Sequence, residues 1–323
     1  MIRALINNSA IHDAAKIIAN GGVVAFPTET VYGLGANVFN AKAVAKIFEI
    51  KSRPFFDPLI VHIASTDDLP KLIIDINNEV CLLAEKFWPG PLTLVLPKKK
   101  RVPEIVTAGL PTVAVRMPDH PVALQLIQAS GCPLAAPSAN KFGCISPTRA
   151  AHIKKQLTGV DFILDGGNTK IGIESTVLHL SGNQIKILRH GAITIEEILK
   201  AVPHLKVIEE SNTSVASPGM LKAHYSPNKP MFILGDVLPK KFKKQRGAIV
   251  SFSGKEIRGY KIVEQLTQNE DLKEYAANLF STLHRLEEAD IEFIVAEPVP
   301  EQGLGLAIMD RLRKAVYRYR NGE

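Results

Sequence analysis

Residues 26–35 have the sequence FPTETVYGLG, and this stretch decides which fold class the sequence predicts. The apolar run from Gly22 to Phe26 is typical of a buried strand, and Asn40 to Ile50 has the apolar spacing of a helix. The loop between them holds hydroxyls, a carboxylate and glycines, which let a backbone approach a ligand closely. It lacks the Gly-Lys-Ser/Thr of a P-loop and the third glycine of the dinucleotide fingerprint. The stretch therefore predicts a small-molecule site between a strand and a helix.

Strand and helix patterns alternate from residue 1 to about residue 208. The runs that predict strands lie at 59–63, 92–96, 112–116 and 134–137, and helical spacing lies at 10–20, 77–87 and 121–130. We expect Ser9 to cap the first helix and Thr194 to open a later one with a capping box. Residues 176–180 and 184–188 flank Ser-Gly-Asn, which is hairpin chemistry. A hairpin among alternating elements predicts an α/β domain with a twisted, open, mixed sheet.

The composition changes after residue 208. Residues 209–230 are rich in Ser, Asn and Pro and predict a linker, yet Ser217–Met220 (SPGM) and His224–Pro227 (HYSP) are unlike an inert spacer. Beyond it, strand patterns lie at 231–235, 247–252 and 292–296, and helical patterns at 272–289 and 304–320. We therefore predict a first domain over 1–208, a linker over 209–230 whose histidine and tyrosine suggest docking onto another surface, and a smaller Rossmann-like α/β domain over 231–323.

Composition and charge exclude several classes of protein. The 323 residues are 46% hydrophobic, without an apolar run that spans a bilayer or the layout of a signal peptide at the start. The three cysteines show no Cys-x-x-Cys spacing, so we expect reduced thiols in a cytoplasmic protein and no metal cage. The formal net charge of +7 weakly favours polyanionic ligands. We interpret the basic runs at 98–101 and 240–244 as solvated loops.

Several basic residues close predicted strands or helices. Lys51 and Arg53 flank one serine before a proline, which suits a phosphate or carboxylate, although cations are also favourable at a helix C-terminus. His62 lies near the end of a strand, where a structural role is the common one. Arg116 closes an apolar strand and needs a partner, either a ligand carboxylate or an internal Asp or Glu.

Hydroxyl and amide groups follow other strand ends. Ser138, Asn140 and Ser146 could bind an anion near a helix start or simply cap that helix, and Ser175 and Arg189 also lie at strand ends. Ligands of open α/β sheets bind outside strand ends, so we expect these groups to converge. Metalloprotease, hydrolase and catalytic-triad motifs are absent from the sequence. The set suggests a site that binds anions, positions them and neutralises charge.

In order along the chain, these motifs resemble those of the YrdC-type threonylcarbamoyl-AMP synthases in their two-domain form. The resemblance rests on PTETVYGL at 27–34, Lys51-x-Arg53-Pro54, PLIVH at 58–62, Ser138-Ala139-Asn140, Ser146-Pro147-Thr148, GIESTV at 172–177, LRHG at 188–191 and the SPGM and HYSP motifs of the linker.

The resemblance implies a nucleotidyltransferase that makes L-threonylcarbamoyl-AMP and pyrophosphate from L-threonine, bicarbonate and ATP, with Mg²⁺ accompanying ATP. The synthesis of that product is the first step toward N6-threonylcarbamoyladenosine in tRNA. Other proteins then transfer the threonylcarbamoyl group to the tRNA. The implied fold is the YrdC-like twisted sheet.

Site residues also follow from the resemblance. The threonine pocket would hold Thr30, His62, Arg116, the Ala136 backbone and Ser175. The ATP site would hold Lys51, Arg53, Asp57, Thr112, Ser138, Ser146, Arg189 and Tyr225. Lys51 and Arg53 would stabilise charge, and no residue is assigned as a general base. Ser52 stands where glycine is common and Asp57 where asparagine is common; a carboxylate there repels phosphates unless Mg²⁺ intervenes.

Two other functions remain open from the residues. A basic, concave α/β surface could hold double-stranded RNA or tRNA weakly without ATP chemistry, and that binding would be sensitive to salt. A carbamoyltransferase of hydrogenase maturation shares a related domain, but those chains are longer and carry Cys-rich zinc motifs that this sequence lacks.

Overall fold

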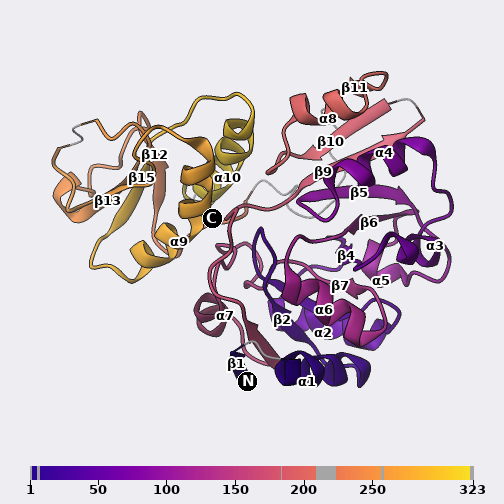
Figure 1. Cartoon of the computed structure of the whole chain (residues 1–323). Helices are drawn as coiled ribbons and strands as arrows, with labels where there is room; N and C mark the ends of the chain where they lie inside the picture. The colour runs from indigo at the N-terminus through magenta and orange to yellow at the C-terminus, as the bar shows by residue number, and fades with distance from the viewer. Residues whose placement is uncertain (1, 6–7, 183, 209–222, 256–257, 321–323) are drawn as a thin grey trace.

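The computed structural model describes residues 2–5, 8–182, 184–208, 223–255 and 258–320. The SPGM motif and most of the predicted linker lie outside these ranges. The described chain forms two sheets side by side, each with its own helices (Figure 1). This confirms the predicted mixed α/β fold with a second, smaller α/β unit.

The first sheet is eleven-stranded and mixed, in the order β1-β8-β2-β3-β7-β4-β6-β5-β9-β10-β11. Its strands are β1 Ile2–Leu5, β2 Val24–Phe26, β3 Gly33–Asn37, β4 Ile60–His62, β5 Leu92–Pro97, β6 Thr112–Arg116, β7 Leu134–Ala135, β8 Phe162–Asp165, β9 Thr176–Ser181, β10 Gln184–Arg189 and β11 Lys206–Ile208. β4 and β6 are parallel, whereas β5 and β6 are antiparallel and β9 and β10 form the predicted hairpin.

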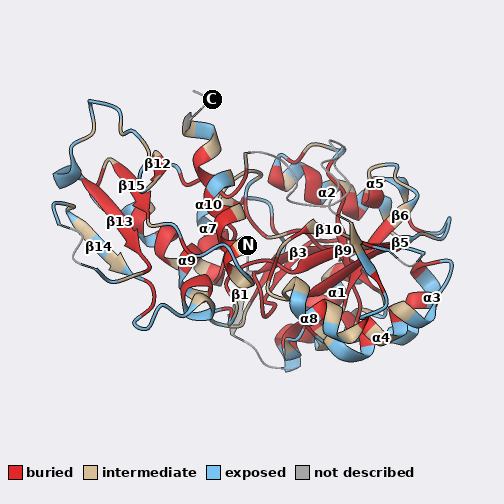
Figure 2. Ribbon diagram, turned by 90° about the horizontal axis from the view of Figure 1, so that it is seen from above, coloured by how far each residue is buried: buried red, intermediate tan, exposed pale blue. Residues whose placement is uncertain are grey.

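Helices cover both faces of this sheet, so its strands are largely buried (Figure 2). The helices are α1 Asn8–Ala19, α2 Ala41–Lys51, α3 Leu69–Leu72, α4 Asn78–Phe87, α5 Glu104–Thr107, α6 Pro121–Ser130, α7 Ala150–Gln156 and α8 Ile195–Ala201, with a 3₁₀ turn η1 at Thr66–Asp68. α1 and α6 pack on one face, and α2 and α4 pack on the other. Thr194 caps α8 with the predicted capping box. α1 begins at Asn8, so the prediction that Ser9 caps it was wrong.

The strand β3 corrects the sequence prediction that residues 33–35 belong to a strand-to-helix loop. β3 pairs antiparallel with β2, with Gly33 opposite Phe26 and Gly35 opposite Val24. A Cβ atom on Gly35 would lie 2.7 Å from the Phe26 ring. The glycines therefore let two strands close around a buried phenylalanine, which is why this strand lacks the β-branched residues that normally indicate one.

The second sheet is four-stranded and parallel, in the order β12-β15-β13-β14. It contains β12 Met231–Ile233, β13 Gly247–Ser251, β14 Ile262–Gln265 and β15 Phe293–Ala296, with the helices α9 Leu272–Glu288 and α10 Leu304–Arg320 and a 3₁₀ turn η2 at Lys244–Arg246. The core between this sheet and its helices continues into Val31, Ile145 and Ile173 of the first unit. The two units therefore share an apolar interface.

Gly172 of the first unit packs tightly against α9 of the second unit. Its φ is +79°, and a Cβ atom there would lie 2.4 Å from the carbonyl oxygen of Ala276 and 2.7 Å from Cα of Ala277, both in α9. We expect Gly172→Ala to push α9 away and lower the free energy of unfolding by about 2–4 kcal/mol, from overpacking plus the left-handed backbone.

Gly167→Ala is the matched control, because Gly167 has a φ of +76° and nothing within 4 Å of the added atom. Gly167→Ala should lower the free energy of unfolding by only about 1–2 kcal/mol, because the left-handed backbone alone is strained. Denaturant unfolding of both variants measures the difference, and equal losses would argue against a tight contact at Gly172.

Candidate active site

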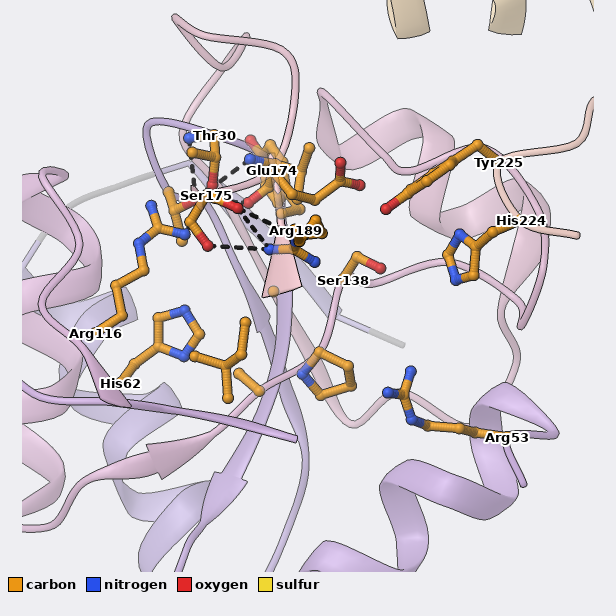
Figure 3. Close-up of a pocket in the computed structure, with 17 residues that line it drawn as sticks. Thr30, Arg53, His62, Arg116, Ser138, Glu174, Ser175, Arg189, His224 and Tyr225 are labelled. Carbon is orange, nitrogen blue, oxygen red and sulfur yellow. Dashed lines mark hydrogen bonds between the residues drawn. The ribbon is translucent and has the colours of Figure 1, made fainter. Parts of the chain in front are cut away.

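A cavity lies where strand ends of the first sheet meet the segment at 224–225 (Figure 3). His62 and Arg116 are register partners at the ends of the parallel strands β4 and β6. Ala136 and Ser138 follow β7, and Arg189 ends β10. The lining comprises Thr28, Thr30–Gly33, Arg53, Ile60, His62, Arg116, Ala136–Ser138, Glu174, Ser175, Arg189, His224 and Tyr225. The polar groups that the sequence placed at strand ends thus largely converge.

Arg116 is 3% exposed and makes three kinds of hydrogen bond. Its Nη2 donates to Glu29 Oε1 at 2.5 Å, its Nη1 to Thr30 Oγ1 at 3.0 Å, and its Nε to the Gly90 carbonyl at 3.2 Å. The internal carboxylate that the sequence left open therefore exists, and it is Glu29. The pair fixes the guanidinium at the cavity wall. Within the described chain, Glu29 Oε2 has no hydrogen-bond partner.

His62 is buried beside Arg116, and its ring meets Phe26 edge-on with centroids 6.0 Å apart. Burial, and then the charge of Arg116, lower the pKa of His62 to about 3. The imidazole is therefore neutral near pH 7. A neutral ring can hydrogen-bond a substrate hydroxyl or amine without adding charge to the pocket.

The low pKa of His62 predicts acid lability. Above pH 6.5 neither the folded nor the unfolded side chain binds a proton, so its contribution to stability is intact. As the pH falls from 6.5 toward 3, only the unfolded chain takes up the proton, which lowers the free energy of unfolding by about 1.4 kcal/mol per pH unit. His152, whose pKa burial lowers to about 2, acts in the same direction.

Urea unfolding at pH 6.5 and pH 5 tests this expectation. His62→Gln should lose about 2 kcal/mol less than the wild type over that interval. The control His12→Gln removes an exposed histidine and should behave as the wild type. An unchanged pH dependence in His62→Gln would show that the native ring can be protonated freely.

Ser175 and Arg189 form a second cluster on the wall. The Arg189 Nη2 donates to the carbonyl and to Oγ of Ser175, each at 3.0 Å, and Nε donates to the same carbonyl at 3.1 Å. Ser175 Oγ also lies 2.8 Å from Thr93 Oγ1. A residue expected to contact threonine and one expected to contact ATP are therefore in direct contact.

Lys51 and Arg53 lie at and just beyond the end of α2. Lys51 Nζ donates to the carbonyls of Ser138, at 2.6 Å, and of Asn140. Burial, and then Arg53, hold the pKa of Lys51 well below its usual value. Arg53 lines the cavity, whereas Lys51 supports the 138–140 backbone from behind.

The two unusual positions of this region have structural explanations. Ser52 has a φ of +52°, the left-handed conformation that favours glycine, and its N–H caps α2. Asp57 is fully buried, and its Oδ2 lies 2.9 Å from Arg53 Nη2. Burial raises the pKa of Asp57 and Arg53 opposes that rise. Asp57 thus offsets the charge of a buried arginine.

Not every predicted residue lines the cavity. Thr112 shares a face of β6 with Arg116 but lies four residues before it, about 13 Å away. Lys51, Asp57 and Ser146 lie behind the lining. Ser146 Oγ donates to Glu174 Oε1 at 2.6 Å, so it reaches the cavity only through that carboxylate.

Tyr225 lies deep between the two units. It is 1% exposed, has a φ of +61°, and stacks on Phe280 of α9 with centroids 5.5 Å apart. Its neighbour His224 meets Phe142 edge-on, and the Ser226 N–H donates to the Gly143 carbonyl at 2.9 Å. The HYSP motif therefore joins the cavity to the second unit.

Sequence reasoning assigned no role to Glu29, Glu174, His224 or Arg311. Three of them stand inside motifs that the sequence analysis quoted, so their position was a signal. Arg311, on α10, lies outside those motifs, so no sequence signal indicated a role for it. Among the described residues no group of three or more His, Cys, Asp or Glu could hold a metal ion, and no helix is both long and apolar enough to cross a bilayer.

Comparisons with known proteins cover both units. The family model Sua5_yciO_yrdC, described as telomere recombination, matches residues 16–191, and the model Sua5_C, described as threonylcarbamoyl-AMP synthase, C-terminal domain, matches residues 193–316. The chain is 44% identical to the threonylcarbamoyl-AMP synthase of Pyrococcus abyssi over 97% of this chain and 96% of that one. It is 42% identical to that of Bacillus subtilis over 96% and 93%.

Solved structures agree. Sua5 of P. abyssi complexed with L-threonine has a TM-score of 0.87 and 43% identity, over 98% of this chain and 97% of that one. YciO of Escherichia coli, at 24% identity and a TM-score of 0.53, covers 61% of this chain and shares the fold.

Proposed function

This chain belongs to the Sua5–YciO–YrdC family, whose full-length relatives are named threonylcarbamoyl-AMP synthases, and from that premise we propose that it makes L-threonylcarbamoyl-AMP. The substrates would be L-threonine, bicarbonate and ATP, and pyrophosphate would leave, which makes the enzyme a nucleotidyltransferase. The product would serve the N6-threonylcarbamoyladenosine modification of tRNA, with other proteins transferring the group. The proposed parts are a synthase domain (1–208), a lid-bearing linker (209–230) and a C-terminal domain (231–323).

The convergence of three arginines on one cavity carries this proposal. Arg116 is oriented by Glu29 and Thr30 on one side, while Arg53 and Arg189 line the cavity elsewhere (Figure 3). An arginine fork suits the carboxylate of an amino acid, and two further guanidiniums suit phosphates. A solved relative binds L-threonine, which supports placing that substrate beside Arg116.

The chemistry needs positioning more than a nucleophilic side chain. The threonine amine would attack CO₂, with loss of one proton to water, or bicarbonate, with loss of a water molecule. An oxygen of the resulting carbamate would then attack the α-phosphorus as pyrophosphate leaves. Arg53 and Arg189 would hold the phosphates at the cavity wall, and Lys51 would brace the 138–140 backbone. Neutral His62 would hydrogen-bond threonine. The two arginines would neutralise the charge that develops on the phosphate oxygens, and no residue is assigned as a general base.

Magnesium would arrive with ATP. Mg²⁺ prefers oxygen ligands, keeps several waters and is commonly held by one or two carboxylates together with phosphates. Asp57 lies just behind the cavity wall, and its Oδ1 has no hydrogen-bond partner within the described residues. Asp57 would hold the ion together with phosphate oxygens and waters, whereas both oxygens of Glu174 are already bonded, to Ser146 and to Arg311.

The cavity is too small for a nucleotide in this structure. Its free volume is about 50 Å³, room for one or two water molecules, whereas nucleotide sites need several hundred. The segment 224–226 would therefore move to admit ATP and return to exclude water from the labile carbamate. That motion would give the linker its proposed role as a lid.

Pyrophosphate release from purified protein with ATP and Mg²⁺ tests the function, with threonine and bicarbonate each omitted in turn. Release should need both and should fade when serine or valine replaces threonine. Pyrophosphate release that does not depend on threonine would indicate another adenylating activity. Salt-sensitive tRNA binding without release would favour the RNA-binding alternative, although Lys98 and Lys99 of one basic run already bond to Glu104 and Pro70.

A further inference from the structure

Arg311 joins the second unit to the wall of the cavity. It lies on α10 with its side chain fully buried. Its Nε donates to Glu174 Oε2 at 3.1 Å, and its Nη1 donates to the His190 carbonyl at 2.6 Å and to Asp310 Oδ2 at 3.1 Å. The guanidinium carbon also lies 5.4 Å from the centre of the Tyr225 ring. One cation from α10 thus reaches three segments beside the site.

Glu174 places a carboxylate at the wall of a cavity that is proposed to bind phosphates. It lines the same cavity as Arg53 and Arg189, where the phosphates of ATP are proposed to bind. A buried carboxylate there would repel them unless a cation offset its charge. Glu174 also accepts the Ser146 hydroxyl at 2.6 Å, so its orientation fixes that hydroxyl.

We propose that Arg311 of the C-terminal unit is a positioning residue of the nucleotide site, which neutralises Glu174 and fixes the orientation in which it holds Ser146. The inference rests on the proposed function, because it concerns the binding of ATP. It gives the C-terminal unit a direct part in nucleotide affinity. Arg311 acts through Glu174 and need not touch the nucleotide.

Contacts other than those of Arg311 also hold the two units together. Apolar side chains of α9 and α10 pack against Val31, Ile145 and Ile173, and α9 also fits over Gly172. His284 of α9 lies 3.1 Å from the Ser146 carbonyl. An isosteric, uncharged residue at 311 should therefore leave the units together and remove only the charge and its hydrogen bonds.

The test compares Arg311→Met, Glu174→Gln and the double variant. ATP affinity is measured by calorimetry with a non-hydrolysable analogue, and KM for ATP and for threonine by pyrophosphate release. Arg311→Met should weaken ATP binding about tenfold or more, because Glu174 is left as an unpaired buried charge, and should change the KM for threonine less than about threefold. The double variant should regain affinity to within about threefold of the wild type, since glutamine has no charge to offset.

Arg313→Met is the matched control. It is the same substitution two positions along α10, where Arg313 pairs with Glu301 at a half-exposed site. It should bind ATP as the wild type does.

The double variant also keeps the test valid if Arg311→Met alone destabilises the protein. Removing both charges of a buried pair is often tolerated when removing one charge is not. Two results would overturn the inference: wild-type affinity in Arg311→Met, or equally weak binding in the single and double variants, which would mean that Arg311 acts through Tyr225 or by docking alone. A wild-type protein that binds no ATP would remove both this inference and the proposed function.

Discussion

Arg116→Met is expected to abolish threonine-dependent pyrophosphate release, with kcat/KM for threonine falling at least about 100-fold. Two charge-assisted hydrogen bonds to a carboxylate are worth about 1.5–3 kcal/mol each, and methionine makes neither. The substitution also leaves Glu29 buried without the Nη2 that now lies 2.5 Å from its Oε1. Unpairing a buried charge costs about 3–5 kcal/mol, so part of the loss could come from unfolding.

Glu29→Gln combined with Arg116→Met separates these two effects. The double variant carries no unpaired carboxylate, so denaturant unfolding should show its stability largely restored while turnover stays lost. Arg116→Lys provides a second comparison, because a point charge cannot reproduce the fork that contacts Thr30 and Glu29 together. If the double variant regained threonine-dependent release, Arg116 would be a structural partner of Glu29 and not a contact for the substrate.

The sequence predicted those elements whose information is local. The capping box at Thr194, the hairpin of β9 and β10 and the spacing of Lys51 and Arg53 each depend on neighbouring residues, and the structure has the elements where the patterns indicated them. β3 was missed for the opposite reason. Its sequence GLGAN has no strand propensity of its own, and it pairs because Gly33 and Gly35 make room for the Phe26 ring.

The site residues that the sequence did not predict also depend on contacts between distant parts of the chain. Arg311 is 137 positions from Glu174, and in sequence it is one of several arginines on a predicted amphipathic helix. Its burial follows from how the second unit docks, which no periodicity encodes. Glu29 was visible inside the first motif, but its role as the partner of Arg116 depends on a fold that brings residues 87 positions apart together.

The second large effect is expected at Lys51. Lys51→Met should lower kcat/KM for ATP about 100-fold, because the Lys51 ammonium braces the 138–140 backbone from behind the cavity wall and lies near Arg53, which lines the proposed phosphate site. Lys46→Met is the control on the same helix, where an exposed lysine donates to the Gly21 carbonyl at 2.8 Å, and it should leave ATP use unchanged.

The pH dependence makes this prediction specific to the charge of Lys51. Burial, and then the neighbouring charge of Arg53, lower the pKa of Lys51, while Asp57 and Cys144 oppose that shift. The free enzyme therefore loses the ammonium at a lower pH than an exposed lysine would, and kcat/KM for ATP should fall as the pH rises through that lowered pKa. ATP phosphates stabilise the charged form, so kcat should fall only at higher pH. Lys51→Met should lack the alkaline fall in kcat/KM, and a variant that kept it would show that another group titrates there.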